Sequence, residues 1–285
     1  MNEAATLSSG KGHNDENFPV ASFVIAPQHR PPVLAFYNFV RTADDVADNP
    51  VAPPEEKLRL LEDMRLSLMG GSDASPEGVA LRKILGERGL TTDHAADLLE
   101  AFRRDVVKLR YADWGELMDY CRYSAMPVGR YVLDVHGESR ETWPLNDALC
   151  AALQVINHLQ DCGKDYRELD RVYLPLDSMG RHGTEASALG ATQATPALKS
   201  VIAELAAKNA ELLATSAAFA GRIKDFRLGL EVAIIQRFAE DLNKKLLTRD
   251  PLSQPVHHKK ADQLLLALGA MGSFFGGRLG LKATP

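Results

Sequence analysis

The sequence predicts an all-α protein. Apolar residues recur at intervals of three and four along most of the 285-residue chain, which is the spacing of amphipathic helices. The alternating β-branched runs that predict strands are absent from the sequence. Glycine and proline, for example at Gly70-Gly71 and Asp250-Pro251, stand where the periodicity stops. These observations together favour a set of packed helices.

Proline marks the expected ends of the first long helix. It should begin near Pro31-Pro32, because proline suits a first helical turn, and end before Asn49-Pro50, because the residue before a proline disfavours the helical conformation. Pro127 is expected to kink a later helix. The other helices are predicted over Glu55 to Met69, Glu77 to Arg88, Asp93 to Arg110, Trp114 to His136, Asn146 to Tyr166, Pro196 to Arg222, Phe226 to Leu247 and Ala261 to Phe275.

The chain shows no repeat of fixed period and no low-complexity linker, so we predict a single domain over residues 16–285. Residues 1–15 are polar and rich in small side chains, which predicts a flexible N-terminal arm. The longest non-helical piece is expected between Leu169 and Gly190, and its length favours a lid or rim.

Composition indicates the cellular compartment and the kinds of partner that the protein has. The 33 basic and 38 acidic side chains give a net charge of -5, which argues against nucleic acid as a partner. Three cysteines without paired spacing, and an N-terminus without an apolar signal core, favour the reducing cytoplasm. The apolar stretch from Leu264 to Gly277 is too short and glycine-rich for a membrane span. We expect it to pack on the core, with contact to a membrane surface left open.

The stretch "RTADDVAD", residues 41 to 48, is the first candidate site. Asp44 and Asp48 are four residues apart and therefore lie on one helix face, while Asp45 points elsewhere. The spacing from Arg41 to Asp45 is that of an ordinary salt bridge within a helix. Alone, this pattern favours a solvated helix end.

A second polar stripe changes that interpretation. Asn157, Asp161 and Asp165 follow at successive steps of four, and Gln154 lies about one turn earlier. The rest of this helix is apolar, so we expect these side chains to be buried, and buried carboxylates require cationic partners. Oxygen ligands without a histidine or thiolate cluster suit magnesium, which proteins commonly hold together with substrate phosphates. Two such helices predict a magnesium-bound diphosphate.

At these residues the chain resembles the squalene/phytoene synthase family. The matching segments are "RTADDVAD" at 41 to 48, "YCRYSAMPVG" at 120 to 129, "QVINHLQDCGKDY" at 154 to 166 and "DRVYLP" at 170 to 175. The resemblance implies an isoprenoid-synthase helical fold with a central cavity, in which both aspartate motifs bind diphosphate through Mg²⁺. It implies metal ligation and catalysis by Asp44, Asp48, Asn157, Asp161 and Asp165, with Gln154 adjoining. It also implies diphosphate contacts from Arg41, Arg171 and Tyr173, with Asp45 a weaker candidate.

Within the family, the chain most resembles the bacterial branch that converts presqualene diphosphate to hydroxysqualene in hopanoid pathways. The segment "ENFPVAS" at 16 to 22 and three departures from the wider family pattern carry this resemblance. Asn14 to Phe18 stands where relatives have a basic His-Ser-Lys-Ser-Phe segment. Gln160 replaces an arginine before the central aspartate of the second motif, and Arg122 replaces a tyrosine. Fewer cations suit a substrate that carries a single diphosphate.

The resemblance implies a mechanism in which magnesium assists ionisation of the diphosphate, the carbocation rearranges in an apolar pocket, and water captures it. Phe18 is a candidate for the pocket wall. Gln154 and Asn157 are preferred over Tyr37 and Tyr123 as guides for the water, because a tyrosine at helical spacing is more often a core residue. No glycine-rich dinucleotide fingerprint follows a strand, and we expect no nicotinamide cofactor.

Two alternatives stay open. One is a squalene, dehydrosqualene or phytoene synthase that condenses two prenyl diphosphates head to head. The other is a non-catalytic helical module that binds partners through exposed acidic helices. For the enzyme, an apolar product makes peripheral contact with a membrane or with neighbouring pathway enzymes compatible with a cytoplasmic location.

Overall fold

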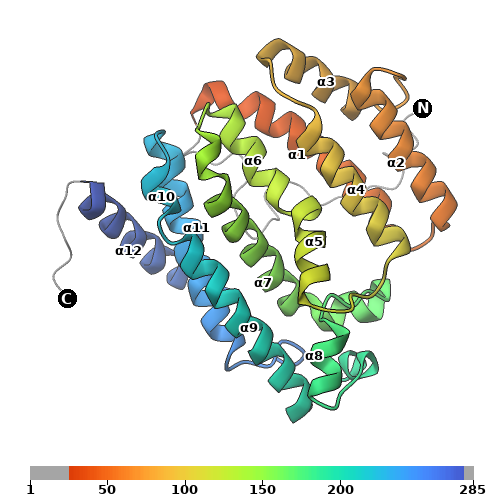
Figure 1. Cartoon of the computed structure of the whole chain (residues 1–285), viewed down its shortest axis with the longest axis vertical. Coiled ribbons are helices and arrows are strands. Elements are labelled where there is room, and N and C mark those ends of the chain that lie inside the picture. Colours follow the sequence, from red (N-terminus) through yellow and green to blue (C-terminus); the bar gives the residue numbers. More distant parts are fainter. Residues whose placement is uncertain (1–25, 279–285) are drawn as a thin grey trace. The chain divides into compact units, whose positions relative to one another are not determined.

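A computed structural model describes residues 26–278, which form helices and contain no strand beyond an isolated bridge between Arg110 and Val172 (Figure 1). The predicted all-α class is confirmed. The predicted arm over residues 1–15 and the candidate Phe18 lie outside the described residues. No helix within the described range is long and apolar enough to cross a membrane.

The described chain divides into two compact units, and the prediction of a single domain over 16–285 stays a prediction. The first unit comprises the chain up to Leu109 together with Pro127–Gly137, and the second comprises Arg110–Met126 and the chain from Glu138 onward. The first unit contains η2 (Pro27–His29), α1 (Arg30–Asp48), α2 (Pro54–Met69), α3 (Pro76–Arg88), α4 (Asp93–Val107) and nearly all of α6 (Met126–Val135). The second contains α5 (Trp114–Ser124), η3 (Arg140–Thr142), α7 (Trp143–Leu169), α8 (Leu176–Arg181), η4 (Ala186–Gly190), α9 (Pro196–Ser216), α10 (Phe219–Arg222), α11 (Phe226–Leu246) and α12 (Lys260–Arg278).

Helix α1 packs against α2, α3 and α4 and supplies one side of the core of the first unit. Phe39, Ala43 and Val46 recur at intervals of three and four on its buried face. Tyr131 of α6 stacks on Phe36 with ring centroids 3.9 Å apart, and its hydroxyl donates to the Pro32 carbonyl at 2.9 Å. These contacts hold the N-terminal half of α1 and leave its acidic C-terminal end to be positioned by α2 and α4.

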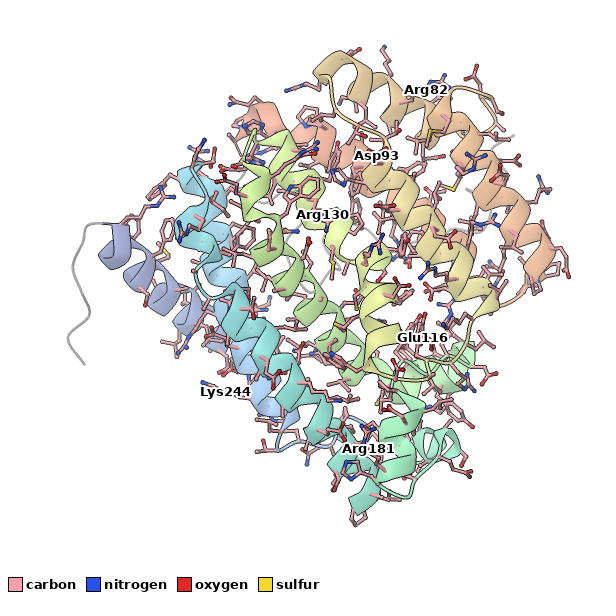
Figure 2. All side chains as sticks on the ribbon, in the orientation of Figure 1. Arg82, Asp93, Glu116, Arg130, Arg181 and Lys244 are labelled. Carbon is pink, nitrogen blue, oxygen red and sulfur yellow. The ribbon has the colours of Figure 1, made fainter. Side chains whose placement is uncertain are left out.

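Helix α7 is the long element of the second unit and packs against α5, α9 and α11. Asn209 of α9 donates both to the Ala152 carbonyl (3.2 Å) and to Asn243 Oδ1 on α11 (3.0 Å), so a buried amide joins the three helices. A Cβ at Gly163 would lie 3.4 Å from Leu189 O and from Leu252 Cγ, so two other segments approach α7 closely at this position. Exposed charges such as Arg181 on α8 and Lys244 on α11 face outward (Figure 2).

Several predicted boundaries need correction. The helix predicted over Trp114 to His136 is broken at Ala125 (φ -126°, ψ -49°), directly before the Met126-Pro127 pair, so the proline interrupts the helix rather than only kinking it. Pro196 to Arg222 likewise divides after Ser216, and the helix from Asp93 ends at Val107. The prediction that 169–190 is non-helical is wrong, because α8 and η4 lie in it.

Gly78 tests the packing of α3 on α2. A Cβ at Gly78 would lie 2.9 Å from Ser67 Cβ and 3.1 Å from the Met64 carbonyl, and the α2 backbone cannot yield cheaply. We expect Gly78→Ala to lower the free energy of unfolding by about 1–3 kcal/mol through overpacking. Gly86→Ala in the same helix, where nothing lies within 4 Å, should raise it by up to about 1 kcal/mol. Urea unfolding followed by circular dichroism measures both, and equal effects of the two substitutions would contradict the close helix contact.

Candidate active site

The acidic end of α1 is organised by Arg41. Its Nη1 donates to Asp44 Oδ2 at 2.8 Å and its Nη2 to Asp45 Oδ1 at 2.6 Å. Asp45 is buried at 7% exposure, whereas Asp44 and Asp48 are partly exposed. The structure therefore confirms the predicted Arg41–Asp45 salt bridge and leaves Asp44 and Asp48 on the more accessible face.

Asn49 fixes the place where α1 stops. Its Oδ1 accepts hydrogen bonds from the backbone N–H groups of Val51 (2.9 Å) and Ala52 (2.8 Å), which makes an Asx turn directly after Asp48. Lys57 of α2 donates to the Ala47 carbonyl at 3.1 Å and satisfies one of the terminal acceptors. The predicted stop before Pro50 is confirmed, and it sets Asp48 in the last turn of the helix.

Asp44 is crowded by other carboxylates. Burial and then the negative charge of Asp48 raise the pKa of Asp44 to about 7; Arg41 opposes this, while Asp45 and Asp105 of α4 add to it. The side chain is nevertheless 33% exposed, so one side of the carboxylate is reachable. Several carboxylate oxygens gathered at one helix end suit a divalent cation with oxygen ligands.

The second polar stripe lies on α7. Asn157 is exposed, and Gln154, Asp161 and Asp165 are partly exposed. The expectation that this stripe is buried is wrong, because the apolar residues of α7 occupy the opposite face and take up its contacts with the other helices of the unit. Exposure alone therefore does not distinguish an enzyme from an interaction module.

A buried aromatic cluster lies beside this stripe. His158 stacks on Tyr173 with ring centroids 3.6 Å apart and an interplanar angle of 17°, and Tyr120 lies 5.9 Å from His158. Gln154 Nε2 lies 3.1 Å from His158 Nε2, so the amide donates to a ring nitrogen whose proton sits on Nδ1. His158 itself is buried, at 5% exposure.

His158 is a neutral group at physiological pH. Burial, and second the positive charge of Arg171, lower its pKa to about 3. A neutral imidazole can keep accepting from Gln154 across the whole working range, and it does not serve as a proton carrier there. His158 thus holds the Gln154 amide in one orientation.

Arg171 and Tyr173 follow a sharp turn at the end of α7. Asp170 takes up the left-handed conformation (φ 51°), the Arg171 N–H donates to the Asp165 carbonyl at 3.1 Å, and Arg110 pairs with the Asp170 carboxylate at 2.5 Å. Both Arg171 and Tyr173 are buried. Gln160, also of interest from the sequence, donates to the Val256 carbonyl.

Tyr37 and Tyr123 are the remaining candidate site residues, and their proposed role stays a prediction. Tyr37 on α1 and Tyr123 on α5 are partly exposed, and the Arg122 guanidinium lies 5.2 Å from the centre of the Tyr123 ring. Sequence reasoning missed Asp105 and the packing of Tyr120 and Tyr173 against His158, although Tyr173 itself was a candidate. Tyr120 and Tyr111 come from segments distant from α7 in sequence, so no spacing pattern could link them to it.

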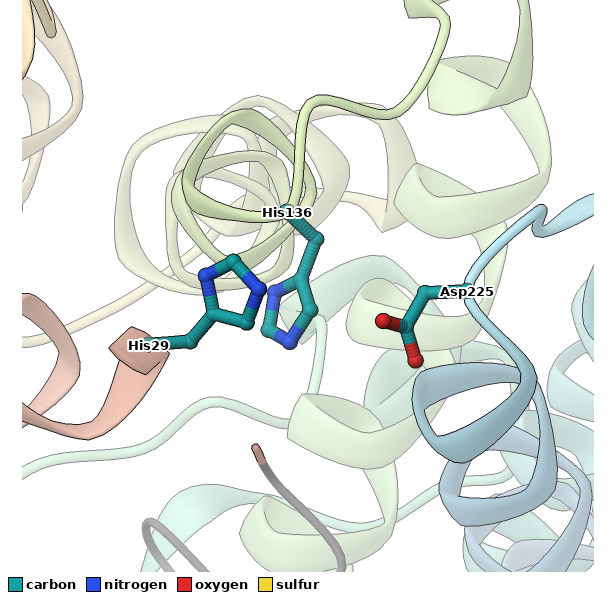
Figure 3. Close-up of side chains that lie close together, drawn as sticks. All are labelled: His29, His136 and Asp225. Carbon is teal, nitrogen blue, oxygen red and sulfur yellow. The ribbon is translucent and has the colours of Figure 1, made fainter. Parts of the chain in front are cut away.

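The first unit also contains a pocket of about 310 Å³ near the start of α1. His29 and His136 line it, with ring centroids 4.2 Å apart and an interplanar angle of 32° (Figure 3). Arg88 and Asp134 are also in its wall. None of the residues predicted to bind diphosphate or metal lines this pocket, so it is separate from the acidic end of α1.

The all-α fold and two carboxylate-bearing helices define the isoprenoid-synthase class. The chain belongs to the squalene/phytoene synthase family, whose model matches residues 12–262. It is 58% identical to hydroxysqualene synthase of Zymomonas mobilis over 95% of this chain and 93% of that protein. It is 54% identical to hydroxysqualene synthase of Rhodopseudomonas palustris over 96% of this chain and 94% of that protein.

Solved structures agree on the fold. A dehydrosqualene synthase in complex with ligand has a TM-score of 0.77 at 22% identity, covering 96% of both chains. A squalene synthase from Alicyclobacillus acidocaldarius has a TM-score of 0.67 at 27% identity, covering 97% of this chain and 92% of that one. The isoprenoid-synthase helical fold is therefore confirmed, and the protein is an enzyme of the kind that acts on prenyl diphosphates.

The raised pKa of Asp44 predicts a pH-dependent penalty on stability. Its folded-state pKa of about 7 exceeds the ordinary value of 3.8, so the folded protein binds this proton more tightly and loses stability as pH rises through that interval. In metal-free protein, Asp44→Asn should therefore be stabilising at about pH 8 and close to neutral at about pH 4.

Thermal unfolding of wild type and variant across that pH range measures the difference. Asp93→Asn, an exposed aspartate on α4, is the control and should show no such trend. A difference between Asp44→Asn and wild type that stays constant with pH would contradict the crowding of carboxylates at this position.

Proposed function

We propose that this protein converts presqualene diphosphate and water to hydroxysqualene and diphosphate, in squalene and hopanoid biosynthesis. The observation that carries the proposal is the relationship to proteins named hydroxysqualene synthase, at 58%, 54% and 49% identity over 94–96% of this chain. Such identity extends across both polar stripes and the segments that support them. The alternative function is the head-to-head condensation of two prenyl diphosphates, which other members of the family carry out. The experiment below distinguishes the two functions.

We propose Mg²⁺ as the cofactor. Asp44 and Asp48 would be its ligands in the first unit, and Asn157, Asp161 and Asp165 in the second. The donor set supports this, because it consists of carboxylate and amide oxygens, and because the crowded Asp44 carboxylate gains from a nearby cation. When bound, the metal would stabilise the negative charge that develops on the departing diphosphate.

The protein's own side chains have distinct parts in the proposal. Arg41 holds Asp44 and Asp45 in place through its two ion pairs, and Arg171 and Tyr173 contribute to the diphosphate site. The carbon–oxygen bond to diphosphate breaks with its electron pair on the leaving group, and a water oxygen forms the new bond and loses its proton. Gln154 and Asn157 guide that water, with the Gln154 amide oriented by neutral His158. No electrons are gained or lost, so no nicotinamide is required.

The proposed substrate is tested directly. Purified protein receives Mg²⁺ and presqualene diphosphate without nicotinamide in one tube, and Mg²⁺ and farnesyl diphosphate in a second, and the lipid extracts are analysed by mass spectrometry. Hydroxysqualene in the first tube and no product in the second is expected. Presqualene diphosphate formed in the second tube would favour a condensing synthase, and no reaction in either would overturn an enzymatic function.

The metal-ligand role is tested by an isosteric substitution. Asp161→Asn removes one negative charge without changing shape, and diphosphate release should fall by at least about 100-fold, since charge stabilisation in the transition state is lost. Glu211→Gln, which removes an exposed carboxylate on α9, should leave the rate within about twofold of wild type. An Asp161→Asn variant with normal helicity and wild-type turnover would refute the role.

A further inference from the structure

Helix α12 has one face without a protein partner among the described residues. On its packed side, Ala270 and Phe274 are buried, and Phe274 comes within 3.0 Å of the Cβ position at Gly229 of α11. On the opposite side, Leu264, Leu265 and Leu268 are 62%, 70% and 55% exposed. Phe275 continues this side at 40% exposure.

The exposed leucines form a continuous stripe. Leu264 and Leu268 are one turn apart and Phe275 is two turns further along, so all three lie on one face of the helix, with Leu265 beside them. No charged residue occurs between Asp262 and Arg278. A helix on a water-facing surface ordinarily presents polar or charged side chains on its outer face, whereas this one presents leucine.

An aromatic group extends the stripe at the C-terminal end of α12. Phe226, at the start of α11, is 43% exposed, and its ring centroid lies 5.5 Å from the centroids of Phe274 and Phe275. The Arg278 guanidinium lies over these rings, 5.6 Å from Phe226 and 4.9 Å from Phe274. Together Leu264, Leu265, Leu268, Phe275 and Phe226 are called the α12 face below.

Basic residues flank the α12 face at both ends. Lys259 and Lys260 are exposed at the N-terminal end of α12. Cations at a helix N-terminus oppose the helix dipole, so these lysines are not explained by stability of the helix. Around the aromatic end the exposed cations are Arg222, Lys224, Arg227 and Arg278. Asp225 and Asp262 adjoin these ends and are only partly exposed. Asp241 is paired with Lys245 and His258, and buried Glu138 accepts from the backbone N–H groups of Lys224 and Asp225.

We propose that the α12 face docks on the surface of a bilayer that contains anionic lipid. An amphipathic helix with an apolar face and flanking lysine and arginine lies in the interfacial plane, where its leucines enter the acyl boundary and its cations meet lipid phosphates. The helix is not long and apolar enough to span the bilayer, which fits a surface position.

Charge favours lipid over a second copy of the chain as the occupant. If two α12 faces paired antiparallel, Lys259 and Lys260 of one helix would meet the Arg278 end of the other. Parallel pairing would bring identical basic ends together. Both arrangements oppose like charges across an apolar contact, whereas an anionic surface complements both ends at once.

The test uses the whole protein and vesicles, without substrate, so its outcome is independent of the proposed reaction. Flotation with vesicles of phosphatidylglycerol and phosphatidylcholine should recover the protein, and vesicles of phosphatidylcholine alone should bind it at least about tenfold more weakly. Leu265→Glu/Leu268→Glu should reduce binding to the mixed vesicles by more than about 100-fold, because two inserting side chains become charged.

Lys259→Glu/Lys260→Glu should weaken binding about tenfold or more and lower its sensitivity to salt. Met69→Glu, which changes a 47% exposed side chain at the end of α2, is the matched control and should bind as wild type does. Circular dichroism verifies that each variant keeps its helicity.

Three results would overturn the proposal: no flotation of wild type, equal binding to both vesicle types, or unchanged binding of the leucine variant. A dimer in sedimentation equilibrium that Leu265→Glu/Leu268→Glu dissociates, with no flotation, would assign the α12 face to a second copy instead.

Discussion

The carboxylate cluster at the end of α1 is the constraint on which the proposed site depends. Three aspartates occur within its last turns, a fourth approaches from α4, and Arg41 forms ion pairs with Asp44 and Asp45. Burying like charges this way costs stability unless a cation accompanies them. The fold maintains the cluster by ending α1 with the Asn49 turn and packing its apolar side against α2 and α4. A protein that had no use for a cation here would gain stability by neutralising Asp44.

In the second unit, the Gln154 side chain is oriented by a neutral group rather than by a charged one. His158 is buried against Tyr173 with Tyr120 nearby, and burial holds its imidazole neutral. The neutral ring accepts from Gln154 without adding a charge beside the stripe. A protonated imidazole would have no ring nitrogen left to accept from Gln154.

Local sequence signals predicted the parts of the structure that depend on local chemistry. The stop of α1 follows from Asn49-Pro50, and the salt bridge of Arg41 follows from helical spacing. Pro127 predicted only a kink in one helix, whereas the structure breaks that helix at Ala125. Periodicity also showed that Asn157, Asp161 and Asp165 share a face. It did not show that this face is accessible, because exposure depends on where α5, α9 and α11 pack. The cluster around His158 was out of reach for the same reason, since its tyrosines come from other segments.

Gln160 affects both the charge beside the polar stripe of α7 and the packing of this helix. In the family pattern this position carries an arginine, so Gln160 removes a positive charge. In the structure the Gln160 amide donates to the Val256 carbonyl, in the segment that leads into α12. An amide matches a single carbonyl without bringing an uncompensated charge to a partly buried position, whereas a guanidinium would need further acceptors there. The exchange therefore removes positive charge next to Asp161 and at the same time ties α7 to the chain that positions α12. Fewer cations beside the stripe suit a substrate with one diphosphate.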